Sequence, residues 1–122
     1  MAGQCVGALY DPRLDNFVPD NVKGDPKAIK NWAVKEMKYT AQAAKNMGVK
    51  VVNGFTGSPI WKYFYSFPQT SEQMIKDAYE EIVEVWTPIF DVFDENGVRF
   101  ALEVHPTEIA YDYYTTEKLF KV

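Results

Sequence analysis

Residues 98–108 of the chain read VRFALEVHPTE, an apolar run that leads directly into polar side chains. Side chains of a strand alternate between its two faces, so Glu103 and His105 point the same way. Pro106 has no amide hydrogen to give to a neighbouring strand and ends the regular segment. We therefore predict a strand over about 98–104, with two groups at its end that can bind metal or transfer protons.

Two more segments have the composition of buried strands. Residues 4–10 form a short apolar run that halts at Asp11 and Pro12, and residues 49–55 are rich in β-branched side chains and bounded by glycines. Mixed charges, prolines and a glycine predict a loop over residues 11–24. Strands are therefore expected at about 4–10 and 49–55 as well as at 98–104.

Helical periodicity occupies the intervals between and after these strands. Asp25 is placed to cap a first helix that has Pro26 at its first position and ends at Gly48. Apolar residues then recur at three- and four-residue spacing in the next interval. The predicted helices span about 26–47, 71–96 and 115–121.

The second helix has two features that decide its shape. Thr70 followed by Gln73 has the spacing of a capping box, and Ser71 is the alternative cap. Pro88 removes one backbone hydrogen bond, at a cost of about 3 kcal/mol in an ideal helix, so we expect a kink or a break into two pieces. Trp86 and Phe90 lie on its apolar stripe and are predicted to be core residues, like Trp32 of the first helix.

Strand, helix, strand, helix and strand at this spacing are typical of parallel βαβ units. The chain has 122 residues, which suits one domain over 1–122 and is too short for two ordinary cores. The predicted fold class is α/β with a parallel βαβαβ sheet.

Composition and charge exclude several classes of partner. The net charge is −4 and the thirteen basic residues are scattered, so we expect no nucleic-acid partner. No apolar run approaches the roughly 20 residues needed to cross a bilayer, and the first residues lack a secretory pattern, so we expect no membrane partner and a cytoplasmic location. The single cysteine, Cys5, is read as a small buried hydrophobe with no chemistry.

Two motifs together resemble a known family. Residues 103–112 (EVHPTEIAYD), with 52–58 (VNGFTGS) upstream, are similar to the sugar phosphate isomerase/epimerase family of xylose-isomerase-like TIM barrels. The resemblance extends over nearly the whole chain but covers about three of the eight βα units of such a barrel. It implies a partial (β/α)8 barrel with open sheet edges that are covered by association with another chain.

The resemblance also implies roles for particular residues. Glu103 matches a ligand of a divalent metal (Mn, Mg, Co or Zn) and one of two carboxylates that move a proton at the sugar carbon. His105 would be a second metal ligand or would contact the sugar with Glu108. The residues implied at the mouth of the neighbouring strand are Asn53, Thr56 and Ser58, with Trp61 as an apolar wall for a sugar face.

Each of these residues also has a purely structural interpretation. Glu103 is alternatively a solvent-facing acid, and His105 a ring whose polar atoms are satisfied by nearby backbone. Glu108 is more typical of a loop surface than of a catalyst. The aromatic loop over residues 61–67 either stacks on a sugar or covers one end of the core, and Tyr111, Tyr113 and Tyr114 have the same two alternatives, with core packing favoured.

Three functions are consistent with this sequence. In the first, the chain is a piece of a sugar isomerase/epimerase barrel that self-associates and is inactive alone, because one carboxylate and one histidine fall short of the about six donors that a hard divalent ion takes. In the second, other copies or a partner chain complete a metal-dependent isomerase. In the third, the chain is a non-catalytic carbohydrate-binding or self-assembly module.

Overall fold

The computed structural model describes residues 9–10, 17–60, 63, 69–106 and 108–122. Within these ranges the strands and helices alternate, with two strands that each lie between helices. In chain order the elements are η2 (a 3-10 helix, Asp20–Val22), α2 (Pro26–Asn46), β1 (Val51–Gly54), α3 (Glu72–Glu95), β2 (Arg99–Leu102) and α4 (Tyr113–Leu119).

β1 and β2 form a parallel pair, as the sequence predicted. Val51 lies opposite Arg99, and Gly54 lies opposite Leu102. Both strands are shorter than the predicted segments 49–55 and 98–104. Of the predicted strand 4–10, Leu9 and Tyr10 lie in a turn, so the strand prediction is wrong for these two residues, and the rest lies outside the described residues.

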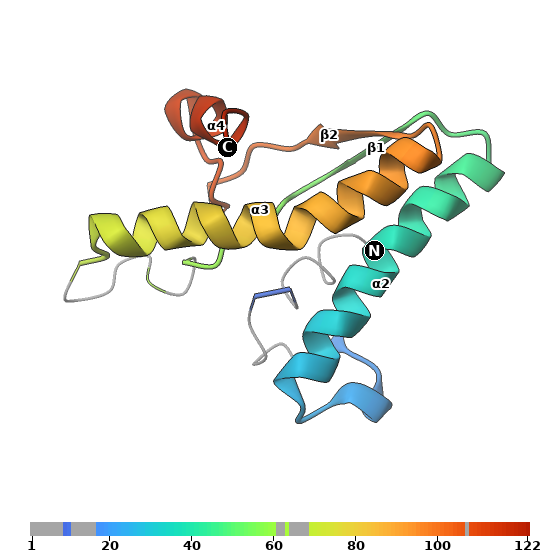
Figure 1. Cartoon of the computed structure of the whole chain (residues 1–122), viewed down its shortest axis with the longest axis horizontal. Helices are drawn as coiled ribbons and strands as arrows, with labels where there is room; N and C mark the ends of the chain where they lie inside the picture. The colour runs from blue at the N-terminus through green and yellow to red at the C-terminus, as the bar shows by residue number, and fades with distance from the viewer. Residues whose placement is uncertain (1–8, 11–16, 61–62, 64–68, 107) are drawn as a thin grey trace.

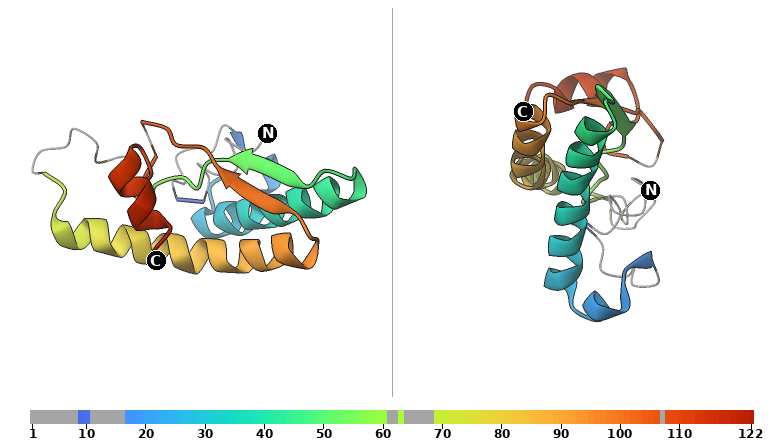
Figure 2. Two further views of the ribbon diagram at one scale, coloured as in Figure 1. Left: turned by 90° about the horizontal axis from the view of Figure 1, so that it is seen from above. Right: turned by 90° about the vertical axis from the view of Figure 1, so that its right-hand side faces the viewer.

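The helices pack on the sheet from one side. Figure 1 shows α2 and α3 converging at the end from which both strands begin, and α4 lying near the carboxyl end of β2. Figure 2 shows the two strands side by side next to these helices. This is the crossover arrangement of a βαβ unit, in which the connecting helix covers the sheet that it links.

α2 has the start and end that local sequence signals predicted. The Asp25 side chain accepts hydrogen bonds from the N–H groups of Lys27 (2.9 Å) and Ala28 (3.0 Å), and Pro26 is the first helical residue. Gly48 follows the helix with a φ of 71°, a left-handed conformation that favours glycine.

α3 begins at the alternative cap and passes through its proline. The Ser71 hydroxyl, not Thr70, accepts the N–H of Met74 at 3.2 Å. The helix continues through Pro88 as one element, and its axis bends near the middle in Figure 1. Of the two expected outcomes, the kink is therefore confirmed and the break is wrong. Ile82, Val85, Trp86, Ile89 and Phe93 are all buried on both sides of the proline, and this packing holds the helix together.

The core lies between the sheet, α2 and α3. Trp86, Phe93, Ile29, Met37 and Ile89 are its largest buried side chains together with Leu9. Two predicted core residues are not fully enclosed. Phe90 is 36% exposed, because its side of α3 lines an open pocket, and Trp32 packs against the core but is half-buried.

α4 begins two residues before the predicted segment 115–121. Asp112 caps it by accepting the N–H of Thr115 at 2.8 Å, and the Thr115 hydroxyl in turn accepts the N–H of Asp112 at 3.0 Å. This capping box fixes Tyr113 as the first helical residue. None of the helices in the described ranges is both long and apolar enough to span a membrane.

The two faces of the sheet differ in character. Phe100 packs against the α3 rings of Trp86 and Phe93, with ring centroids 5.0 and 5.7 Å away. By the alternation of a strand, Arg99 and Ala101 point to the opposite face. That open face is mixed rather than wholly apolar, since Arg99 is exposed there.

Candidate functional site

The candidate site lies where the two parallel strands end. Glu103 directly follows β2, and its backbone N–H donates to the carbonyl of Gly54 at the end of β1 at 2.8 Å. This bond extends the ladder by one residue and fixes the position of Glu103. Its side chain is exposed, so solvent and ligands reach the carboxylate.

A tight turn beyond Glu103 brings His105 and Glu108 together. The N–H of Glu108 donates to the carbonyl of His105 at 2.9 Å, and the N–H of His105 donates to the carbonyl of Ala110 at 3.2 Å. The imidazole packs edge-on against the ring of Phe55, with centroids 5.4 Å apart. His105 is thus held by the loops that follow both strands.

Glu108 is the carboxylate that the fold encloses. Burial raises its pKa above the usual range, while a hydrogen bond from the backbone of Gly57 and the nearby His105 act in the opposite direction. Its Oε2 atom is buried and has no hydrogen-bond partner among the described residues. Glu108 is therefore not a loop-surface residue, and one of its oxygens is available for a further donor.

The loop after β1 is more buried than its polar sequence suggests. Thr56 and Ser58 are only 4% and 5% exposed, and Gly57 between them has a φ of 78°. The Thr56 carbonyl accepts the indole N–H of Trp86 at 2.9 Å and the phenol of Tyr10 at 3.1 Å. These bonds tie the loop to α3 and place Gly57 beside Glu108.

Tyr10 also belongs to this region, although no motif in the sequence singles it out as a site residue. Burial raises the pKa of its phenol far above the usual range, and Trp86 donates to its oxygen at 3.1 Å. Its hydrogen-bond partners are distant in the chain, so no local pattern marks it.

The remaining predicted site residues lie apart from this group. Asn53 is exposed on β1, opposite Ala101 in the register. Trp61 lies outside the described residues. Tyr111, Tyr113 and Tyr114 are 51%, 73% and 77% exposed, so the preference for core packing is wrong: these rings lie just before α4 and in its first turn, in contact with solvent.

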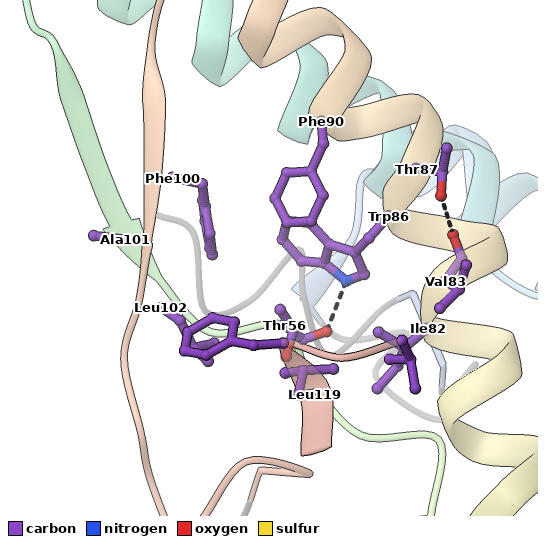
Figure 3. Close-up of a pocket in the computed structure, with 12 residues that line it drawn as sticks. Thr56, Ile82, Val83, Trp86, Thr87, Phe90, Phe100, Ala101, Leu102 and Leu119 are labelled. Carbon is purple, nitrogen blue, oxygen red and sulfur yellow. Dashed lines mark hydrogen bonds between the residues drawn. The ribbon is translucent and has the colours of Figure 1, made fainter. Parts of the chain in front are cut away.

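An apolar pocket of about 370 Å³ lies on the helix side of the sheet, between β2, α3 and α4. Figure 3 shows Phe90 and Phe100 side by side in it, with Leu119 of α4 across from Ile82. Trp86 directs its indole nitrogen to Thr56 at the inner end of the pocket. Among the described residues that line the pocket, none has a carboxylate or imidazole side chain.

The described residues do not make a complete metal centre. No group of three or more His, Cys, Asp or Glu side chains within the described ranges is placed to hold an ion. Glu103 and His105 would supply two donors, where a hard divalent cation takes about six including water. These residues can therefore form at most part of such a site.

Comparison with known proteins identifies a family for this chain. No curated protein matches the chain. The model of the family described as "Xylose isomerase-like TIM barrel" matches residues 10–122, nearly the whole chain. The parallel β1–α3–β2 unit and the polar strand ends fit that family, in which strands and helices alternate around a barrel and the carboxyl ends of the strands carry the chemistry. The chain belongs to the xylose isomerase-like TIM barrel family.

Proposed function

We propose that the chain is a sugar isomerase/epimerase-like unit that binds a sugar or sugar phosphate at the carboxyl end of β1 and β2. The observation that carries this proposal is the Glu108 carboxyl, which is half-buried beside His105 and has one oxygen without a hydrogen-bond donor among the described residues. Buried polar atoms normally have partners, so an open oxygen at the strand ends of this family is suited to a ligand hydroxyl.

Two acids at this end have complementary properties. Burial raises the pKa of Glu108, so its protonated and ionised forms are both populated near that pKa. The protonated carboxyl can donate a hydrogen bond to a ligand, and the carboxylate can accept one. Glu103 is exposed, and among the described residues its backbone N–H is the group that is bonded, to the carbonyl of Gly54. We propose that Glu108 and His105 orient sugar hydroxyls, and that Glu103 faces the reacting carbon and supplies one ligand if a divalent metal is bound.

In this proposal the lone chain binds sugar without converting it. Isomerisation or epimerisation needs a proton to be removed at one position and returned at another, and one strand end holds only part of that machinery. The remaining groups and metal ligands would come from other copies or from a partner chain. Catalysis is therefore a property of the completed assembly.

Binding is tested by titrating the chain with fructose, xylose and a fructose phosphate, followed by NMR chemical shifts. Glu108→Ala is expected to weaken binding roughly 10- to 100-fold, because a hydrogen bond to a charged group contributes about 1.5–3 kcal/mol. Glu95→Gln, at the exposed end of α3, is the matched control and leaves affinity unchanged. Equal affinities of wild type and Glu108→Ala would exclude the proposed site.

The metal and turnover parts are measured separately. Calorimetric titration with Mn²⁺ is expected to show weak binding that Glu103→Gln reduces further, and unchanged binding excludes Glu103 as a ligand. Exchange of the carbon-bound hydrogen of the sugar for solvent deuterium reports turnover. The lone chain is expected to show no exchange. If exchange is observed and persists in the Glu103→Gln variant, residues other than Glu103 carry out the catalysis.

A second candidate function is carbohydrate binding through tyrosines. Tyr113 and Tyr114 are 73% and 77% exposed and meet edge to face, with ring centroids 5.5 Å apart. Exposed aromatic rings offer apolar faces to sugars. If this surface is the binding site, Tyr114→Ala weakens sugar binding while Glu108→Ala does not.

A further inference from the structure

Two neighbouring helices of the chain carry opposite charge. α2 has five lysines and a single acidic residue, Glu36, whereas α3 has eight acidic residues and a single lysine, Lys76. The lysines of α2 are Lys27, Lys30, Lys35, Lys38 and Lys45, and the acidic residues of α3 are Glu72, Asp77, Glu80, Glu81, Glu84, Asp91, Asp94 and Glu95. α2 and α3 are in contact, so a basic surface and an acidic surface lie side by side (Figure 1).

Both charged surfaces face away from the sheet. By the helical repeat of about 3.6 residues per turn, Lys35 lies on the side of α2 opposite to the buried Ala33 and Ala44. Glu84 and Asp91 lie in the same way opposite to the buried residues of α3, and all three charged residues are exposed. The helices of a (β/α)8 barrel form its outer ring, so these surfaces stay on the outside when the barrel is closed.

One ion pair joins the two surfaces among the described residues. Lys30 Nζ lies 3.2 Å from Glu81 Oε1, and this contact places the two residues at the same level along the neighbouring helices. In the described ranges, no ion pair includes Lys35, Glu84 or Asp91. Their charges are therefore available to a partner.

We propose that a second copy of the chain docks on this surface, with its α2 on α3 of the first copy and its α3 on α2 of the first copy. A two-fold axis that bisects the angle between α2 and α3 generates this arrangement, and each α2 then runs along the opposing α3 in the same direction. In the register that the ion pair sets, Lys35 of one copy lies near Glu84 of the other, and Lys38 lies near Asp91. The interface is closed, because both copies use the same surface.

Charge complementarity selects a second copy as the occupant. A nucleic acid attracted by the lysines of α2 would be repelled by the carboxylates of α3, and a basic peptide attracted by α3 would be repelled by α2. A partner with both signs side by side avoids these penalties, and the chain itself supplies that pattern. An isolated exposed ion pair contributes little, but here the contacts repeat along both helices and are doubled by the two-fold axis.

Charge reversal tests the docking. In sedimentation equilibrium of the full chain at low salt, wild type is expected to be a dimer whose dissociation constant rises with added salt, because salt screens exposed charges. The α2 variant is Lys35→Glu/Lys38→Glu, and the α3 variant is Glu84→Lys/Asp91→Lys. Each variant is expected to raise the dissociation constant about tenfold or more, because like charges then meet in both halves of the interface.

A matched control separates the docking surface from net charge. Lys50→Glu/Lys121→Glu changes the net charge by the same amount as the α2 variant, at two exposed lysines that lie on neither α2 nor α3. This control variant is expected to dimerise like wild type. Circular dichroism confirms that each variant is folded.

Mixing the two variants tests which helix meets which. At the reversed positions, the α2 variant has acidic residues on both helices and the α3 variant has lysines on both. Each reversed position therefore meets an opposite charge in an equimolar mixture, and native mass spectrometry is expected to show heterodimers with an affinity near that of the wild-type dimer. The α3 variant mixed with the control variant has like charges in one half of the interface and is expected to give less heterodimer.

The outcomes are distinct from those of the sugar site. All measurements use a chelator and no sugar, and the exchanged side chains lie on the outward faces of α2 and α3 rather than at the strand ends. A monomer at all concentrations, a dimer insensitive to the α2 and α3 variants, or a variant mixture with no more heterodimer than its control overturns the proposed interface. The proposed function is untouched by any of these results, and a failed sugar titration leaves the interface standing.

Discussion

The indole N–H of Trp86 on α3 donates a 2.9 Å hydrogen bond to the carbonyl of Thr56, just beyond the end of β1. Trp86 is 1% exposed, so this bond lies in the core, and it joins the crossover helix to the loop that carries Gly57. Because Gly57 donates to Glu108, the position of this half-buried acid depends on α3. Core packing and the candidate site are therefore physically linked.

Replacing Trp86 by Phe tests this link. The variant removes the donor and part of the buried ring, and is expected to lower the free energy of unfolding by roughly 1–3 kcal/mol. Urea denaturation measures the loss. Trp32→Phe removes the same atoms from a half-buried ring and is expected to cost less, so equal losses would contradict a special role for the Trp86 bond.

Removal of the Thr56 hydroxyl is expected to raise the free energy of unfolding, in contrast to the Trp86 substitution. Its Oγ1 is buried and has no hydrogen-bond partner among the described residues. Thr56→Val keeps the shape and removes the unsatisfied group, so we expect thermal unfolding to shift to higher temperature, with a gain of up to roughly 1–3 kcal/mol. Thr87→Val is the control: that hydroxyl is bonded to the Val83 carbonyl at 2.7 Å, and no gain is expected.

The raised pKa of Glu108 predicts that the stability of the fold depends on pH. Its pKa is raised in the folded state, so the folded chain binds the proton more tightly than the unfolded chain. The stability that this group contributes is full below its unfolded pKa and is lost as the pH rises through the folded pKa. Glu108→Gln removes this titration, so the variant is expected to be the more stable at neutral pH. Its advantage over wild type should shrink on acidification in a series of melting curves, and a constant difference would exclude Glu108 as the source.

Substitution at the N-cap of α3 tests whether Ser71 stabilises the start of this helix. Ser71→Ala removes the acceptor for the Met74 N–H and is expected to cost about 0.5–2 kcal/mol of unfolding free energy. Ser71→Asp retains a capping acceptor and is expected to lose little. Thr70→Ala is expected to be nearly neutral. A larger loss of unfolding free energy for Thr70→Ala than for Ser71→Ala would show that Thr70, and not Ser71, caps α3.

The sequence predicts those features that depend on neighbouring residues. Asp25 and Pro26 mark the start of α2 because capping requires only the groups of one helical turn. The parallel order of β1 and β2 follows from a helix between two apolar segments. These features need no knowledge of distant contacts.

Other features depend on parts of the chain that meet only after folding. Glu103 and Glu108 are both acids near one strand end, and only the turn from His105 to Ala110 determines which is enclosed. Tyr10 reaches Thr56 across the core, which no periodicity reveals. Phe90 has the spacing of a core residue, but the pocket beside it leaves it partly in solvent.

Each residue of β1 is separated in the chain from its partner in β2 by the whole of α3. Closing so long a loop costs chain entropy before any ladder bond forms, whereas helical turns gain their bonds locally. We expect α2 and α3 to form and dock early in folding, with the strands joining them last. In native-state hydrogen exchange, the amides of the short ladder should accordingly exchange before those at the centre of α3.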